Sequence, residues 1–164
     1  MIIKGKALKY GDDVNTDVIY PGRHLAITEP AEMAKHAMED LDPDFMKKFA
    51  KGDIVVAGKN FGCGSSREQA ATCLQYAGVG AIISKSFARI FFRNAINQGI
   101  LILQSPDAVE GIDDMDAVSI NTAKGIIRNE KTGAEFTIHP LPEFLQEIID
   151  AGGLIPALKK KLGK

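Results

Sequence analysis

Cysteine is scarce in this sequence, and the scarcity excludes several classes of protein. The 164 residues contain two cysteines, Cys63 and Cys73. Two cysteines can form one disulfide at most, unlike the cysteine-rich framework of a small secreted domain. An iron–sulfur cluster normally takes about four thiolate ligands, so two thiols cannot hold one. We therefore expect this chain to bind no metal or cofactor of its own.

The sequence also has no excess of positive or negative charge. The 20 Lys and Arg residues are balanced by 21 Asp and Glu residues, which gives a net charge of -1. A nucleic-acid-binding domain normally carries an excess of basic residues, so the balance argues against that class. We interpret the basic cluster Lys159–Lys161 as a solvated helix end and expect no nucleic-acid or membrane partner.

Long apolar runs are absent as well. No run approaches the ~20 residues that span a bilayer, and residues 1–6 lack the apolar stretch of a signal peptide. Apolar residues make up 45% and charged residues 25%, as in ordinary folded domains. We expect one domain over residues 1–164, in a soluble protein of the cytoplasm.

The middle of the chain alternates between strand and helix patterns. Short apolar runs predict strands at 53–57, 81–84 and 100–103, with helices at 66–77 and 88–97 between them. This order is typical of parallel strands joined by right-handed helical crossovers. The ends add a strand at 2–8, three short β-segments at 117–120, 125–128 and 135–138, and terminal helices at 142–151 and 154–162. The fold class is therefore α/β, with a small added sheet in the same unit.

The stretch Phe61–Glu68, Phe-Gly-Cys-Gly-Ser-Ser-Arg-Glu, carries the clearest functional signal. It follows a predicted buried strand and opens a helix, a frequent place for anion sites in open sheets. Glycines let backbone N–H groups turn toward a ligand, and Arg67 offers a planar fork for a carboxylate or phosphate. A capping box, with Ser65 as N-cap and Glu68 three residues later, fits equally well. Spacing alone leaves both interpretations open.

Two common catalytic motifs do not fit this stretch. A P-loop needs a lysine that the turn lacks, and Glu68 stands where a nucleophile elbow around the preceding serine needs glycine. A hydrolase that uses Ser65 would have to recruit His24, His36 or His139, none of which lies nearby in the sequence. That alternative has no local support.

Four stretches together resemble the small-subunit family of the isopropylmalate dehydratases, two-chain relatives of aconitase. They are residues 11–19, 52–68, 85–97 and 151–154. The resemblance implies a single swivelling β/β/α three-layer domain, like the aconitase C-terminal domain, that closes over an active site in a separate large subunit. It also implies that this partner holds a [4Fe-4S] cluster, with one iron exposed to a small hydroxy-dicarboxylate substrate.

The resemblance further implies a hydro-lyase that interconverts 2- and 3-isopropylmalate in leucine biosynthesis, active only with its large subunit. The first serine of the family's Gly-Ser-Ser-Arg turn is the catalytic base, which corresponds to Ser65. Ser66, Arg67, Asp17 and Arg23 correspond to substrate contacts. A serine alkoxide is a poor resting state in water, so the backbone N–H groups, the helix dipole and the arginine must stabilise it.

Local alternatives remain for several of these residues. Asp17 also fits an Asx-turn, and Arg23 also fits a solvated surface charge. Arg89 and Arg93 lie one helical turn apart, and we expect structural pairing there rather than substrate contact. Cys63 fits a small filler beside the turn better than a redox-sensitive thiol.

The family resemblance also assigns a specificity loop, His24, Leu25, Ala26 and Ile27. A homoaconitase-like chain carries arginine where Ala26 stands, whereas Ala26 and Ile27 offer an apolar surface that suits an isopropyl group. His24 departs from the tyrosine that is more usual there. The alternatives are a related hydro-lyase for methylmalate (citraconate), dimethylmalate or homoaconitate, and a non-catalytic anion-binding module of the same fold.

Overall fold

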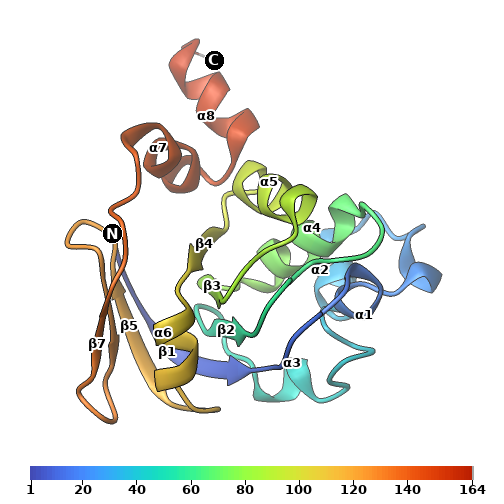
Figure 1. The fold of residues 1–164 in the computed structure, drawn as a ribbon. Coiled ribbons are helices and arrows are strands. Elements are labelled where there is room, and N and C mark those ends of the chain that lie inside the picture. Colours follow the sequence, from blue (N-terminus) through green and yellow to red (C-terminus); the bar gives the residue numbers. More distant parts are fainter. Residues whose placement is uncertain (164) are drawn as a thin grey trace.

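The strands of the computed structural model, which describes residues 1–163, form one sheet (Figure 1). Its order is β4-β3-β2-β1-β5-β6-β7, so β1 lies at the centre. β1 pairs in parallel with β2 and antiparallel with β5, which joins a parallel half to an antiparallel half. The strands are β1 (Ile2–Lys9), β2 (Ile54–Ala57), β3 (Ala81–Ser84), β4 (Leu101–Gln104), β5 (Ala117–Asn121), β6 (Ile126–Asn129) and β7 (Glu135–Thr137).

The parallel half has an apolar core on each face, because β2 and β3 are buried on both sides. On one face, Val55 and Ile82 pack with residues of helices α4 (Glu68–Ala77) and α5 (Arg89–Asn97). On the other face, Val56 and Ile83 pack with α6 (Pro106–Gly111) and with the apolar residues of β5 and β6. The sheet therefore curls over its own second core and forms a β/β/α arrangement of layers.

The remaining helices are short or lie at the end of the chain. α1 (Thr16–Ile19), the 3-10 helix η1 (Gly22–His24), α2 (Pro30–Ala34) and α3 (Phe45–Lys48) occupy the long connection between β1 and β2. α7 (Glu143–Ala151) and α8 (Leu154–Lys161) stand at the top of the view in Figure 1. Among the described residues, no helix has the length and apolar character needed to cross a membrane.

The predicted α/β order of the central segment is confirmed, with shifts at the element ends. The strand predicted at 81–84 matches β3, and β2, β3 and β4 are parallel as expected. The three short β-segments near the end are also confirmed, but they continue the main sheet through β1. The helix predicted at 66–77 begins two residues later, at Glu68, and ends at Ala77 as predicted, followed by the C-cap Gly78, whose φ of 92° is left-handed.

Asp53 anchors the start of β2 with a buried carboxylate. Its oxygens accept hydrogen bonds from Lys6 N at 3.0 Å, Lys6 Nζ at 2.6 Å and Ala50 N at 2.9 Å. Burial alone would raise the pKa of this carboxyl group, but the bonds from Lys6 and from backbone N–H groups outweigh burial and hold the pKa of Asp53 below its usual value.

We expect Asp53→Asn to destabilise the chain by about 1–3 kcal/mol at neutral pH, because Lys6 loses its buried charged partner. A folded-state pKa below the unfolded value of about 3.9 means that this stabilisation is complete above that value and is lost as the pH falls through the folded pKa. Urea unfolding of both proteins between pH 7 and pH 3 measures this. A difference in unfolding free energy that stays constant over the acid range would contradict it.

Candidate active site at the amino ends of α4 and α5

The turn Gly62–Arg67 is held between two other segments of the chain. Gly62 N donates to Val14 O at 2.7 Å, and Thr16 N donates to Cys63 O at 2.9 Å. On the other side, Ala88 N donates to Phe61 O at 2.9 Å. These bonds fix the turn against the start of α1 and the start of α5, so its conformation is set by parts of the chain far apart in sequence.

Two glycines allow the turn to take this path. Gly62 and Gly64 have φ values of 84° and 93°, in the left-handed region that side chains disfavour. A Cβ atom at Gly62 would also overlap the Phe91 side chain of α5. The turn therefore lies directly against α5, closer than a side chain would permit.

A cavity of about 190 Å³ lies where the amino ends of α4 and α5 meet. Both ends contribute unpaired N–H groups and positive dipole ends, which favour a negatively charged ligand. The lining residues include no histidine, cysteine or carboxylate, so they offer no metal ligands of the usual kind. The lining is Thr16, Gly62, Gly64, Ser65, Ser66, Arg67, Ala88, Arg89, Ile90, Phe91 and Asn94.

Ser65, Asp17 and Arg67 meet at one carboxylate oxygen. Ser65 Oγ donates to Asp17 Oδ1 at 3.3 Å, and Arg67 Nη1 lies 2.8 Å from the same oxygen. Ser65 and Asp17 are exposed to solvent, whereas the Arg67 side chain is largely buried, at 23% exposure. The tertiary structure thus brings together three of the predicted site residues, and Ser66 lines the same cavity.

The Arg67 side chain is fixed by backbone as well as by charge. Nη1 also donates to Tyr20 O at 3.3 Å, and the guanidinium lies against the Cα face of Gly22. Tyr20 is fully buried, and its hydroxyl donates to His24 O at 2.8 Å. Tyr20 therefore connects the arginine of the site to the predicted specificity loop.

The capping-box interpretation of Ser65 and Glu68 is wrong. The N-cap of α4 is Arg67, and no side chain caps this end. Ser65 O instead accepts from Arg67 N at 2.9 Å and from Thr16 Oγ1 at 2.7 Å. The Ser65 hydroxyl is therefore oriented by Asp17 rather than by the helix, which agrees with a role outside α4.

Arg23 and the predicted specificity loop lie beside the site but outside the cavity lining. The Arg23 guanidinium forms two hydrogen bonds with Asp40, at 2.7 and 3.0 Å, on an exposed surface. In the loop, Leu25 and Ala26 are exposed, and Ile27 is half-buried against the core. The Nε2 atom of His24 forms a hydrogen bond with Glu39 Oε2 at 2.8 Å.

Arg89, for which we predicted structural pairing, is a further candidate site residue. It is exposed and lines the cavity at the start of α5, and no ion pair within residues 1–163 involves it or Arg93. The expected structural pairing is therefore not found in the described part of the chain. The sequence did contain a signal for this role, because Arg89 stands at the start of a predicted helix. A positive charge is unfavourable at the positive end of the helix dipole, so binding of a negatively charged ligand is a better explanation for an arginine there.

Cys63 lies in the turn but is not prepared for reaction. Burial, aided by the negative charge of Asp13, raises the pKa of its thiol. A raised pKa reduces the reactive thiolate, so the interpretation of Cys63 as a filler is favoured over a redox-sensitive thiol.

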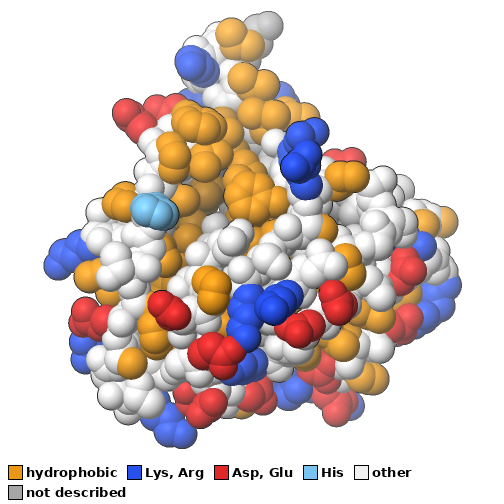
Figure 2. Space-filling model, viewed as in Figure 1, with side chains coloured by type: hydrophobic (Ala, Val, Ile, Leu, Met, Phe, Trp, Pro, Cys, Tyr) orange, Lys and Arg blue, Asp and Glu red, His pale blue; other side chains and the backbone are white. Residues whose placement is uncertain are grey.

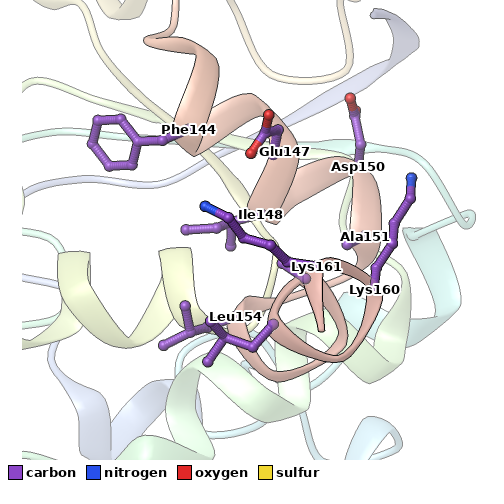
Figure 3. Close-up of a pocket in the computed structure, with 10 residues that line it drawn as sticks. Phe144, Glu147, Ile148, Asp150, Ala151, Leu154, Lys160 and Lys161 are labelled. Atoms are coloured by element: carbon purple, nitrogen blue, oxygen red, sulfur yellow. The ribbon is translucent and has the colours of Figure 1, made fainter. Parts of the chain in front are cut away.

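The molecule has a second, larger hollow that lacks comparable chemistry. A groove of about 530 Å³ lies between α7 and α8. Figure 2 shows apolar side chains gathered over these helices, and Figure 3 shows Phe144, Ile148 and Leu154 in the groove with Lys160 and Lys161 nearby. The groove lacks the two converging helix amino ends and the serine that the 190 Å³ cavity has. We therefore place the candidate site in the 190 Å³ cavity.

The fold and the site define a class of protein. The chain is a curled α/β domain whose β2–α4 turn presents a serine and an arginine to a cavity, and residues 14–108 match the family described as Aconitase C-terminal domain, so it is an aconitase-type domain.

Curated relatives and a solved structure narrow the class. The chain is 54% identical over 164 residues to the 3-isopropylmalate dehydratase small subunit of Caldicellulosiruptor saccharolyticus, covering 100% of this chain and 95% of the relative. It is 46% identical to small subunit 1 of Methanopyrus kandleri, covering 98% and 94%. The crystal structure of the Methanocaldococcus jannaschii 3-isopropylmalate dehydratase protein matches with a TM-score of 0.93 and 47% identity, over 99% and 96% of the two chains. The chain belongs to the family of 3-isopropylmalate dehydratase small subunits.

Proposed function

We propose that this chain is the small subunit of a 3-isopropylmalate dehydratase, a hydro-lyase that interconverts 2- and 3-isopropylmalate in leucine biosynthesis. The observation that carries the proposal is the convergence of Ser65, Asp17 and Arg67 beside the amino ends of two helices. Relatives of nearly the same length bear that name, which supports the assignment. We further propose that it works in the cytoplasm as one swivelling domain.

The reaction removes a weakly acidic C–H proton and expels hydroxide from the neighbouring carbon. A [4Fe-4S] cluster in a large subunit would supply the Lewis acid that helps the hydroxide leave. The cavity of this chain is lined by no thiolate, imidazole or carboxylate, which fits a cluster held by the partner. The chain's own part is then the base and the substrate carboxylate contacts.

Ser65 is the proposed base. Ser65 lines the cavity, and Asp17 orients its hydroxyl. When the hydroxyl proton of Ser65 passes to the Asp17 carboxylate that accepts its hydrogen bond, the positive ends of α4 and α5, with Arg67, lower the energy of the alkoxide left on Ser65, which then takes the substrate C–H proton. The same groups hold a substrate carboxylate, with Ser66 beside them.

Arg23 and the loop that follows it are the proposed specificity elements. Arg23 and Asp40 are both substantially exposed, so a substrate carboxylate can replace Asp40 at modest cost. Ala26 and Ile27 would face the alkyl branch of the substrate. Tyr20 is hydrogen-bonded both to this loop and to Arg67. It would therefore fix the position of the loop that contacts the alkyl branch relative to the arginine that contacts the carboxylate.

Reconstitution with a large subunit tests the proposal. The chain and an isopropylmalate dehydratase large subunit are assembled under anaerobic conditions with iron and sulfide, and formation of the unsaturated intermediate from 3-isopropylmalate is followed by absorbance. We expect activity from the assembled pair and none from either subunit alone.

Citraconate, dimethylmalate and homoaconitate assayed on the same complex identify the substrate. A higher kcat/KM for one of them would assign a related hydro-lyase instead. A stable complex that turns over none of these substrates would leave a non-catalytic anion-binding module as the function.

A further inference from the structure

Two histidines and one glutamate converge beside the site. His24 Nε2 lies 2.8 Å and His36 Nδ1 lies 2.9 Å from the same oxygen, Oε2 of Glu39. The two imidazole rings stack with centroids 3.7 Å apart and an interplanar angle of 17°. The three possible ligand atoms lie within 4.8 Å of one another, and the side chains are 17%, 23% and 34% exposed.

Two separate segments supply these side chains, and both are fixed by backbone bonds. His24 ends η1, where its carbonyl accepts from the buried Tyr20 hydroxyl. His36 and Glu39 belong to the turn after α2, where Met38 N donates to Ile19 O at 2.7 Å. The cluster therefore rests on the framework of α1 rather than on a free loop.

We propose that His24, His36 and Glu39 form a binding site for a zinc-like divalent transition-metal ion. Two imidazoles and one carboxylate are a common three-ligand set for such ions, with water completing the coordination. This departs from the expectation, drawn from the sequence, that the chain binds no metal. The reason is that His24 and His36 are separated in sequence by a helix and meet only in the folded chain.

The geometry must change to admit the ion, because the lone pair of an imidazole nitrogen lies in its ring plane, and the two rings, now stacked at 17°, must tilt before both nitrogens point at one ion. Zinc–ligand distances of about 2.0–2.1 Å place neighbouring ligand atoms about 3.3 Å apart, so the present 2.8 and 2.9 Å separations must open by roughly 0.5 Å. Each imidazole must present an unprotonated nitrogen to the ion. The other nitrogens, His24 Nδ1 and His36 Nε2, take part in none of the hydrogen bonds of residues 1–163 and can carry the proton instead.

The charges around the cluster both favour and oppose a cation. Asp40 adjoins Glu39 and adds negative charge, but Arg23 Nη2 lies 3.5 Å from Glu39 Oε2 and competes for it. The two bonds from Arg23 to Asp40 do not use Glu39, so an ion on Glu39 need not break them. The ion therefore displaces one long ion pair and can leave the stronger one in place.

Metal binding would fasten η1 to the turn after α2. The fastened segment carries Arg23 and the predicted specificity loop, so the ion would reduce the mobility of the residues that face the substrate. The site itself depends only on the three side chains, and its test does not require the proposed enzymatic function to be correct.

Isothermal titration of the full chain with Zn²⁺, after treatment with a chelator, tests the site. We expect one saturable ion per chain, and no saturable binding of Mg²⁺, which prefers oxygen ligands. His36→Gln and Glu39→Gln should each weaken Zn²⁺ binding at least tenfold, about the loss seen when even an outer-shell partner is removed. Arg23→Gln should tighten binding, because the competing cation is removed.

His139→Gln is the matched control, since His139 is the third histidine and is exposed elsewhere on the surface. It should bind Zn²⁺ as the unmodified chain does, and circular dichroism without metal checks that each variant is folded. Absence of saturable Zn²⁺ binding, or equal binding by Glu39→Gln and the unmodified chain, would overturn the proposal. So would a loss of binding in His139→Gln. If a histidine variant fails to fold, the expected gain in Arg23→Gln still decides the question.

Discussion

Ser65→Ala is expected to lower kcat of the reconstituted enzyme by about 10²–10⁴-fold, the range for loss of a positioned general base. KM should change little, because the base acts in the transition state and the carboxylate contacts of Arg67 and Ser66 remain. Steady-state kinetics with 3-isopropylmalate measure both constants. Near-normal kcat in a folded complex would remove Ser65 from the chemistry.

The stability of the same variant separates catalysis from structure. Ser65 does not cap α4 and its side chain is exposed, so Ser65→Ala should change the free energy of unfolding by less than about 0.5 kcal/mol. A capping serine would instead lose about 1 kcal/mol. Ser66→Ala is the matched control in the same turn. As a predicted substrate contact it should raise KM more than it lowers kcat.

Arg67→Lys is expected to lower kcat/KM by roughly 10–100-fold, which corresponds to about 1.5–3 kcal/mol for a charged hydrogen bond. The guanidinium simultaneously contacts Asp17 Oδ1 and Tyr20 O and lies against Gly22. A lysine ammonium is a point charge and cannot maintain these contacts while it also binds a carboxylate in a planar fork. Both KM and kcat should suffer, because Asp17 also orients Ser65.

Arg93→Lys is the matched control for this substitution. Arg93 is exposed on α5 and does not line the cavity, so its conversion to lysine should leave both constants unchanged. Equal kinetics for Arg67→Lys and the unmodified enzyme would place Arg67 outside the substrate site. Equal losses in the two variants would point to a general charge effect instead.

The parallel core was predictable because its signals are local. β2 and β3 are short, continuous apolar runs, which is the pattern of strands buried on both faces. Gly78 follows the last helical residue of α4 and has the left-handed conformation that glycine adopts at helix ends. The order of the strands could not be predicted from local patterns. The first strand lies at the centre of the sheet because it also pairs with β5, which lies over a hundred residues later in the chain.

The site likewise combines features that local sequence patterns predicted with contacts that only the tertiary structure formed. The sequence by itself determined that the Gly62–Arg67 turn would follow a buried strand and open a helix, because glycine spacing and apolar patterning act over a few residues. Only the tertiary structure decided that Asp17, 48 residues before Ser65, would hold its hydroxyl, that Arg89 would line the cavity, and that His24, His36 and Glu39 would meet. These contacts join distant segments, and their geometry depends on how the packed sheet and helices place each backbone, which no local pattern encodes.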